Sequence, residues 1–209
     1  MTHTLSIPTT DDLLLEGERR AAEGPTRAAV VLCHPHPQYG GTMRSLVISA
    51  LFDSLPTVGV ECLRFNYRGV EGSTGTYGEG VGERLDVVAA LDALVDTCAA
   101  SVPIGLIGWS FGADMALATH DPRVSGWMGI ALPMRFVTDA DRAAVAADPR
   151  PKRLTLAQHD EFRDAEWVVE ATQEWTNTRV DIVPGASHFF VGRTDRVSEL
   201  AADFVTELE

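Results

Sequence analysis

Short, continuous apolar runs alternate with longer amphipathic segments along most of this chain. The runs are rich in β-branched residues, which is typical of strands buried on both faces of a sheet. Between them, apolar residues recur every three or four positions, as in a helix that packs one face against a sheet. We therefore predict strands at residues 28–33, 60–65, 127–131, 154–157 and 179–183, with one more beginning at residue 104, and helices at 43–55, 84–99, 166–176 and 198–208, with one more beginning at residue 113.

The alternation of strands and helices predicts a mostly parallel sheet, because each helix returns the chain to the end of the sheet at which the previous strand began. We expect an α/β fold with helices on both faces, and a β-hairpin over residues 5–22 at one edge. Residues 136–150 are irregular or weakly helical and are the one, small candidate for a lid. The chain has 209 residues, no repeats and no linker, so residues 1–209 are predicted to form a single domain.

The balance of charges limits the partners of this chain. Asp and Glu number 30 against 17 Lys and Arg, so the formal net charge is −13. A negative field repels nucleic-acid phosphates and anionic lipids, so we expect neither nucleic acid nor a membrane as a partner. The first eight residues lack a basic stretch followed by an apolar one, and no apolar run is long enough to cross a membrane. We predict a cytoplasmic protein.

The three cysteines and two neighbouring histidines do not form a recognisable metal site. Cys33 and Cys62 lie in predicted strands, where a free cysteine usually acts as a small buried apolar residue. Cys98 lies outside the strands, and a redox role for it stays open. His34 and His36 are separated by one proline and lack the ligand spacings of known zinc sites, so we expect no bound metal.

The segment 104–117 combines an apolar run, a turn and a helical pattern. Its turn reads Gly108-Trp-Ser-Phe-Gly112, which matches Gly-x-Ser-x-Gly between a strand and a helix. In such a nucleophile elbow the turn is so tight that no Cβ fits two residues before or after the serine. The serine backbone is strained, and its hydroxyl is exposed at the carboxyl end of the sheet. We therefore predict Ser110 as a nucleophile, against the alternative of a plain glycine-rich turn.

A serine hydroxyl needs a base to take its proton and a carboxylate to orient that base. Of the six histidines, His188 is the best placed, because it follows the last predicted strand and the small residues 185–187 can form a flexible turn toward the serine. Asp160 lies directly after a strand, between Ser110 and His188 in the chain, and is the favoured acid. Glu161 is the main alternative, since a shift of one residue is easily made from sequence.

Acyl transfer also needs N–H donors for the oxygen that becomes negatively charged. One should be the main-chain N–H of Phe111, directly after the serine. The other should come from the loop after the first buried strand, in which two prolines lack an N–H and leave His36 and Gln38 as the early donors. We predict His36 from its position. Phe111 and His36 would then form the oxyanion hole.

Arg68 and a set of aromatic residues are assigned less narrowly. Arg68 follows a strand and precedes a glycine; it could bind a substrate carboxylate, but a structural role that ties its loop to neighbouring elements is the favoured interpretation. Several aromatic residues lie near predicted strand ends, and we expect some of them to line an acyl or alcohol pocket and the others to belong to the core. The pocket candidates are Tyr39, Trp109, Phe136 and Phe189, with Phe190 as a neighbour.

Five motifs together resemble those of α/β hydrolases. They are His34-Pro-His-Pro-Gln-Tyr-Gly-Gly-Thr-Met43, Arg64-Phe-Asn-Tyr-Arg-Gly69, Gly108-Trp-Ser-Phe-Gly112, His159-Asp-Glu161 and Gly185-Ala-Ser-His-Phe-Phe190, and they span nearly the whole chain in the family's order. More narrowly, the chain is similar to the small, lidless, dienelactone-hydrolase-like group of predicted bacterial hydrolases. The resemblance implies the α/β-hydrolase fold, with Ser110 as nucleophile, Asp160 as acid and His188 as base.

The chain departs from this group at two places. Dienelactone hydrolase itself has a cysteine nucleophile, whereas this chain has Ser110, which argues against dienelactones as substrates. Ahead of Asp160 the family typically shows a glycine and an acidic residue, whereas this chain has Ala157 and Gln158.

These residues predict a serine hydrolase without cofactor or metal that cleaves small-molecule carboxylic esters through an acyl-enzyme. The same triad can serve a thioesterase, a peptidase or an acyltransferase, because the chemistry of the site is shared. A binding protein that never turns over is the alternative of a different class, and the intact Ser110, Asp160 and His188 argue against it. We expect a monomer or a homodimer.

Overall fold

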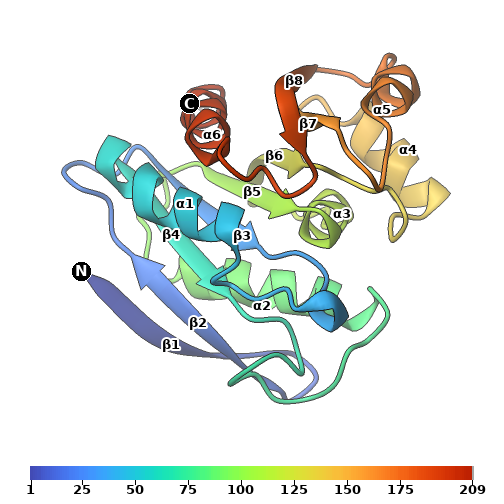
Figure 1. Cartoon of the computed structure of the whole chain (residues 1–209). Helices are drawn as coiled ribbons and strands as arrows, with labels where there is room; N and C mark the ends of the chain where they lie inside the picture. Colours follow the sequence, from blue (N-terminus) through green and yellow to red (C-terminus); the bar gives the residue numbers. More distant parts are fainter. Residues whose placement is uncertain (209) are drawn as a thin grey trace.

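The computed structural model describes residues 1–208, and in this part of the chain eight strands form one sheet (Figure 1). Their order across the sheet is β1-β2-β4-β3-β5-β6-β7-β8. An antiparallel hairpin of β1 (Thr2–Pro8) and β2 (Leu14–Arg20) forms one edge, and β2 also pairs antiparallel with β4 (Val60–Phe65). The other neighbours are parallel: β3 (Ala28–Cys33), β5 (Ile104–Trp109), β6 (Val124–Ile130), β7 (Lys152–His159) and β8 (Thr178–Ser187). The predicted parallel sheet and edge hairpin are confirmed.

Helices cover both faces of the sheet, as predicted (Figure 1). One face carries α1 (Leu46–Ser54) and α6 (Thr194–Thr206), which contact each other. The opposite face carries α2 (Gly82–Val95), α3 (Phe111–Leu117), α4 (Asp139–Ala147) and α5 (Ala165–Thr172). Two short 3-10 helices, η1 (Pro37–Tyr39) and η2 (Leu55–Val58), follow β3 and α1.

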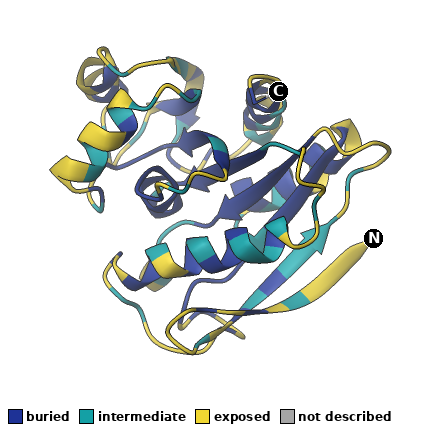
Figure 2. Ribbon diagram, turned by 180° about the vertical axis from the view of Figure 1, so that it is seen from behind, coloured by how far each residue is buried: buried dark blue, intermediate teal, exposed yellow. Residues whose placement is uncertain are grey.

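The central strands are buried on both faces because their side chains point alternately to the two helical layers. In β3, Val30 and Leu32 pack toward α1 and α6, whereas Val31 and Cys33 pack toward α2 and α3. Figure 2 shows this contrast: the central strands are buried, and β1 at the edge is largely exposed. A continuous apolar run in the sequence is therefore the signature of a strand covered on both sides.

The predicted ranges 28–33 and 60–65 coincide with β3 and β4, but several other boundaries were wrong. The first predicted helix begins at Leu46 rather than at residue 43, and the helix predicted over 84–99 is α2, which ends at Val95. Strand β6 begins at Val124, before its predicted start, and β7 and β8 continue past their apolar runs, because ladder hydrogen bonds with neighbouring strands extend there. The segment 136–150 contains the helix α4, which begins with a capping box between Thr138 and Asp141.

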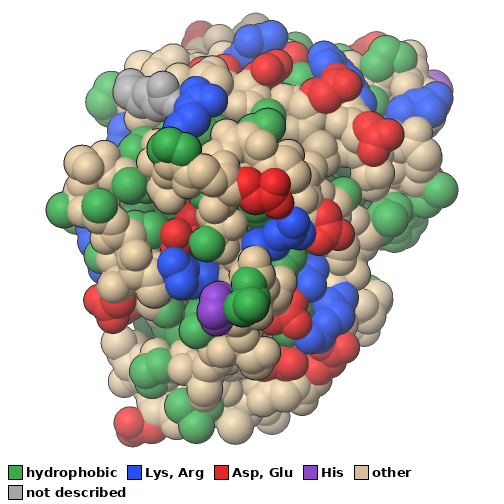
Figure 3. All heavy atoms as spheres, turned by 90° about the vertical axis from the view of Figure 1, so that its left-hand side faces the viewer, with side chains coloured by type: hydrophobic (Ala, Val, Ile, Leu, Met, Phe, Trp, Pro, Cys, Tyr) green, Lys and Arg blue, Asp and Glu red, His purple; other side chains and the backbone are tan. Residues whose placement is uncertain are grey.

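Acidic and basic side chains are interleaved on the face beside β1, β2 and α1 (Figure 3). Arg44 contacts both Glu18 and Glu71, and Arg64 contacts Glu18 at 2.6 Å. Within residues 1–208, no helix has the length and apolar content that crossing a bilayer requires.

Candidate active site

Ser110 lies in a sharp turn between β5 and α3. Its φ of 56° and ψ of −123° are strained for a residue with a Cβ, at a cost of about 1–3 kcal/mol. The two glycines of the motif make the turn possible: a Cβ at Gly108 would lie 2.0 Å from the carbonyl oxygen of Gly112, and a Cβ at Gly112 would lie 2.1 Å from that of Cys33. The main-chain N–H of Ser110 donates to the Ile130 carbonyl oxygen at 2.8 Å, which attaches the turn to β6.

The three side chains predicted as a triad lie in hydrogen-bond contact. His188 Nε2 is 2.9 Å from Ser110 Oγ, and His188 Nδ1 is 2.8 Å from Asp160 Oδ2 and 3.0 Å from Oδ1. A carboxylate can only accept, so Nδ1 carries the proton and Nε2 is free to accept the serine hydroxyl proton. The side chains of His188 and Asp160 are 6% and 4% exposed, so little water competes for these contacts. The arrangement allows proton transfer from the serine to the imidazole.

Asp160 and Glu161 contact different parts of His188. Asp160 also accepts the main-chain N–H groups of Phe162 at 2.9 Å and Arg163 at 3.2 Å, which hold its carboxylate toward the imidazole. Glu161 instead accepts the main-chain N–H of His188 at 3.1 Å. Of the two candidate acids, the structure therefore brings Asp160 to the ring and Glu161 to the backbone.

The backbone of His188 is held at both ends, which corrects the prediction of a flexible turn before it. Strand β8 continues through Ser187, which pairs with His159 of β7 beyond an irregularity in the ladder. The indole N–H of Trp109 donates to the carbonyl oxygen of His188 at 3.1 Å. Trp109 is almost fully buried, so it supports the main chain of His188 from within the core. It does not line an open pocket, contrary to the prediction from sequence.

Gln158, which departs from the pattern of the resembled family, has a local structural role. Its side-chain oxygen accepts the main-chain N–H of Gly185 at 2.7 Å, at the irregularity in the pairing of β7 with β8. The amide thus replaces a ladder hydrogen bond next to the two strand ends that carry Asp160 and His188.

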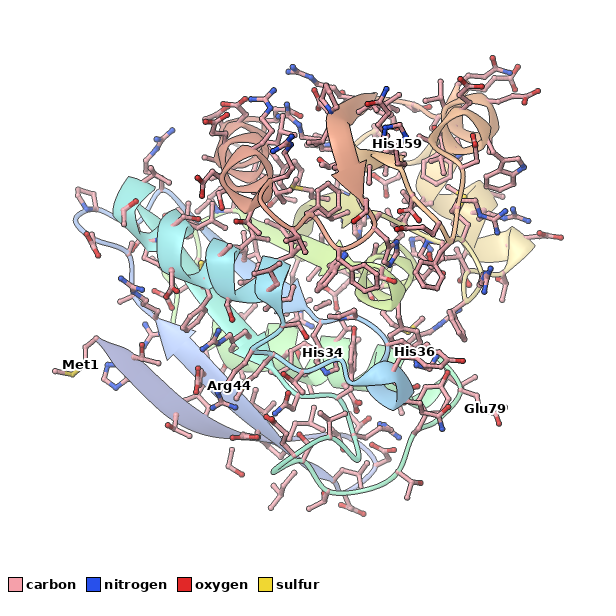
Figure 4. The ribbon with its side chains drawn as sticks, viewed as in Figure 1. Met1, His34, His36, Arg44, Glu79 and His159 are labelled. Carbon is pink, nitrogen blue, oxygen red and sulfur yellow. The ribbon has the colours of Figure 1, made fainter. Side chains whose placement is uncertain are left out.

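His34 anchors the loop in which the second oxyanion donor was predicted. It is fully buried, its Nε2 accepts the main-chain N–H of Tyr67 at 3.1 Å, and its Nδ1 donates to the Pro35 carbonyl oxygen at 2.6 Å. Burial lowers the pKa of His34 to about 3, so the ring is neutral and has one donor and one acceptor, both used. Figure 4 shows His34 and His36 in succession on the segment that leads from β3 into η1.

The structure favours His36 over Gln38 as a main-chain donor. The N–H of Gln38 already donates to His36 Nδ1 at 3.2 Å, and the N–H groups of Tyr39 and Gly41 donate to the His36 carbonyl oxygen. The main-chain N–H of His36 has no acceptor within residues 1–208. The N–H of Phe111, at the first position of α3, likewise has no intrahelical partner.

The remaining pocket candidates lie on two sides of Ser110. On the oxyanion side, the Phe136 ring lies 4.9 Å from that of Phe111, and Tyr39 is 86% exposed with its ring 4.7 Å from His36. On the histidine side, Phe189 is 48% exposed and its ring lies 5.5 Å from the imidazole of His188. Its neighbour Phe190 is fully buried and belongs to the core.

Two aromatic residues near the site were missed from the sequence. The Phe162 ring lies 4.5 Å from that of His188, and the hydroxyl of Tyr77 lies 3.2 Å from His36 Nε2. Phe162 follows Asp160 by two residues, which is a signal that could have been used. Tyr77 lies in the glycine-rich loop before α2, where nothing in the sequence distinguishes it.

The buried carboxylate of Asp114 organises the loop that carries Phe136. It accepts the main-chain N–H groups of Met134, Arg135 and Phe136 at 2.8–3.0 Å. Burial raises the pKa of Asp114 to about 6, although these three hydrogen bonds act in the opposite direction. Asp114 lies on α3, so the same short helix carries the turn of Ser110 and the anchor of this loop.

Arg68 is buried between two carboxylates, as its favoured interpretation requires. Its guanidinium donates to Asp86 at 2.7 Å and to Asp11 at 2.8 Å, and its main-chain N–H also donates to Asp86. These contacts tie the loop after β4 to α2 and to the hairpin, and they leave the cation unavailable to a substrate carboxylate.

Cys98 and the nearby surface offer no comparable chemistry. Burial, with a contribution from the charge of Glu61, raises the pKa of the Cys98 thiol to about 11, so it stays protonated at neutral pH. This argues against the redox role that the sequence left open. A recess of about 730 Å³ lies beside Cys98 and Ile104, at the amino end of β5, whereas Ser110 lies just beyond the carboxyl end of that strand.

Comparison with known proteins places this geometry in a family. No protein-family model matches the chain. An uncharacterized protein of Rickettsia prowazekii is 30% identical over 203 residues, which cover 93% of this chain and 85% of that protein. The solved structure of an α/β serine hydrolase homologue from Coxiella burnetii is 29% identical, with 97% of this chain and 96% of that chain covered and a TM-score of 0.86. The chain belongs to the α/β-hydrolase family.

A further solved structure agrees with the small size of this α/β hydrolase. A protein from Xanthomonas campestris, described as an α/β serine hydrolase without lid, is 22% identical with a TM-score of 0.82, and the match covers 98% of this chain and 93% of that one. The α/β-hydrolase fold predicted from sequence is confirmed, and in this chain the segment between β6 and β7 contains only the short helix α4. Membership of the dienelactone-hydrolase-like group stays a prediction.

Proposed function

We propose that this α/β hydrolase is a serine esterase that cleaves small carboxylic esters. The observation that carries the proposal is the contact of 2.9 Å between His188 Nε2 and Ser110 Oγ, with Asp160 on the other ring nitrogen. A hydroxyl that shares its proton with an oriented, neutral imidazole is an activated nucleophile. The two main-chain N–H groups beside it supply the second requirement of acyl transfer.

The proposed reaction has two steps of the same kind. Ser110 Oγ attacks the ester carbonyl carbon while its proton passes to His188 Nε2, and the carbonyl oxygen becomes an anion that accepts the N–H groups of Phe111 and His36. The tetrahedral intermediate then loses the alcohol, which takes the proton from Nε2, and an acyl-serine remains. Water attacks this ester in the second step, with His188 again taking and returning one proton, so that the acid is released and Ser110 is regenerated.

The short segment between β6 and β7 favours small acyl groups. It holds only the nine-residue helix α4 and two loops, and α4 buries a single residue, Val145. A long acyl chain would therefore find little apolar cover. We expect kcat/KM to fall as the acyl chain lengthens well beyond a few carbons; a steady rise through long-chain esters would contradict this proposal.

The first experiment is intact-mass analysis after treatment with a fluorophosphonate, which phosphonylates activated serines. We expect one adduct on the unmodified protein and none on Ser110→Ala. Ser49→Ala is the matched control, because Ser49 lies on α1 and its hydroxyl binds the Arg44 carbonyl oxygen; it should keep the adduct. Absence of an adduct on the folded, unmodified protein would favour a non-catalytic binding protein.

A second measurement distinguishes the hydrolases that share this triad. We would compare an ester, a thioester and an amide with the same acetyl group, each followed by release of acetate. We expect the ester to have the highest kcat/KM relative to its uncatalysed rate. A higher relative value for the thioester or the amide would replace the esterase with a thioesterase or a peptidase, and acetyl transfer to an added alcohol in preference to water would indicate an acyltransferase.

A further inference from the structure

Two exposed phenylalanines cover the imidazole of His188 without contributing to the core. Phe162 and Phe189 are 47% and 48% exposed, and neither belongs to the buried clusters on the two faces of the sheet. Their rings lie 4.5 and 5.5 Å from the imidazole and 6.2 Å from each other, edge to face. Two half-exposed rings held in this geometry present an apolar surface that folding does not require.

The position of these rings relative to the proposed reaction identifies what they would contact. The proton that His188 takes from Ser110 must be given to the oxygen of the leaving alcohol, so that oxygen comes within hydrogen-bond distance of Nε2. The carbonyl oxygen points the other way, toward the N–H groups of Phe111 and His36. The carbon atoms of the alcohol therefore extend past the imidazole, on the side that carries the two phenylalanines.

The charges around these rings disfavour an anionic alcohol. Phe162 follows Asp160 and Glu161, whose carboxylates bind the ring and the main chain of His188. An anionic alcohol would be repelled by both groups at this end of the sheet. The rings themselves pack best against another flat apolar group, by offset or edge-to-face contact.

We infer that Phe162 and Phe189 form a binding subsite for the leaving alcohol, and that this subsite selects aromatic alcohols such as benzyl alcohol over small aliphatic ones. The inference rests on the proposed esterase activity and adds the class of alcohol to it. Tyr39 and Phe136, on the oxyanion side, have no part in this selection.

The test compares kcat/KM for benzyl acetate and ethyl acetate, which share the acyl group and release alcohols of similar basicity. In Phe162→Ala and in Phe189→Ala, we expect the benzyl-to-ethyl ratio to fall on the order of 10-fold, while ethyl acetate itself changes by less than about 3-fold. Phe162→Tyr and Phe189→Tyr keep a ring and should keep most of the ratio. Both positions are half-exposed, so circular dichroism should show unchanged folding in all four variants.

Two controls separate this subsite from other roles of the rings. Tyr39→Ala truncates an exposed aromatic ring on the opposite side and should leave the benzyl-to-ethyl ratio unchanged. Ethyl phenylacetate places the ring on the acyl side, and its ratio to ethyl acetate should be the same in the phenylalanine variants as in the unmodified protein. If the rings only shield the imidazole from water, both acetates will lose rate together, and that result would overturn the inference.

The remaining outcomes are equally decisive. A selective loss of ethyl phenylacetate hydrolysis would assign the rings to the acyl side and refute an alcohol subsite. If the unmodified protein hydrolyses none of these esters, the proposed esterase activity fails, and the subsite fails with it. If it hydrolyses them with an unchanged ratio in the variants, the esterase activity stands and the subsite alone is refuted.

Discussion

Two buried pairs, each made of a basic and an acidic side chain, differ in whether a hydrogen-bonding atom of the basic side chain remains available for another group. Arg68 and Asp86 form one pair, and His188 and Asp160 the other. The charge of the Arg68 guanidinium is compensated on two sides, because Asp86 and Asp11 accept its N–H groups. The imidazole of His188 uses one nitrogen for Asp160 and keeps the other directed at Ser110 Oγ.

The comparison shows why burial of a charged pair is weak evidence for catalysis. Burial raises the pKa of Asp86, so the perturbed group of the structural pair could be mistaken for an acid–base catalyst. What distinguishes the pair at Ser110 is an acceptor nitrogen aimed at a nucleophile. The following variants test this distinction, from the largest expected effect to the smallest.

The largest effect should follow Asp160→Asn. An asparagine amide donates to His188 Nδ1, which places the imidazole proton on Nε2 and removes the acceptor that Ser110 needs. We expect kcat to fall by about 10³- to 10⁴-fold with little change in KM, in measurements of initial ester hydrolysis rates. Glu161→Gln is the matched control: it keeps an oxygen for the His188 N–H and should lose less than about 10-fold. Equal losses in the two variants would remove Asp160 from its proposed role.

Asp86→Asn should show the opposite profile. It leaves the buried guanidinium of Arg68 without its main carboxylate, which costs about 3–5 kcal/mol in the free energy of unfolding. The activity of the fraction that stays folded should be unchanged, because this pair does not contact Ser110. Urea unfolding and active-site titration with a fluorophosphonate measure the two quantities. A loss of kcat per labelled site would contradict the assignment of Arg68 as structural.

Asp114 extends the comparison to a carboxylate whose hydrogen bonds come from main-chain N–H groups; the positive charge of Arg163 acts with them to lower its pKa, against the effect of burial. Its pKa is about 6 in the folded protein and 3.8 as the ordinary value, so the folded state holds a proton that the unfolded state releases between these pH values. The contribution of Asp114 to stability is therefore present below pH 4 and is lost as pH rises to 6. The loss amounts to about 3 kcal/mol.

The measurement for Asp114 is the free energy of unfolding at several pH values, in the unmodified protein and in Asp114→Asn. The asparagine does not titrate, so the difference between the two proteins isolates this group. The unmodified protein should lose stability relative to the variant between pH 4 and 6, with a constant difference above pH 7. A difference that is independent of pH would show that the carboxylate titrates in its ordinary range.

The smallest effect is expected from Trp109→Phe, which removes the hydrogen bond to the His188 carbonyl oxygen. Loss of one such bond costs about 1 kcal/mol of stability, and the freed histidine backbone should lower kcat several-fold without a change in KM. Trp127→Phe is the matched control, since the Trp127 indole donates to the Thr119 carbonyl oxygen at 3.2 Å, away from Ser110. It should lose similar stability and keep its kcat. Equal kcat values in both variants would limit Trp109 to packing.

Much of the fold could be predicted because each central strand has a continuous run of apolar residues in the sequence. Strands β3 and β4 match their predicted ranges since both faces of the sheet are covered there. The ends of β7 and β8 were missed because pairing between strands, not residue type, carries them on to His159 and Ser187. The helix α4 was predicted only weakly, since only one of its residues, Val145, is buried.

The sequence by itself determined which reactive side chains the molecule has and the order in which the fold presents them. Gly108 and Gly112 leave room for the tight turn around Ser110, where a Cβ would clash with the backbone, and the order of Ser110, Asp160 and His188 along the chain follows from the succession of strands. These properties depend on local backbone geometry and on topology, and both are readable from a pattern.

Only the tertiary structure decided which atoms meet. It brought Asp160 rather than Glu161 to the imidazole, used the N–H of Gln38 within its own loop, and buried Trp109 beneath His188. It also brought Phe162 next to the imidazole, although Phe162 lies 26 positions before His188 in the chain. Contacts of this kind depend on the direction in which each side chain points. That direction is set by packing between segments that are distant in the sequence.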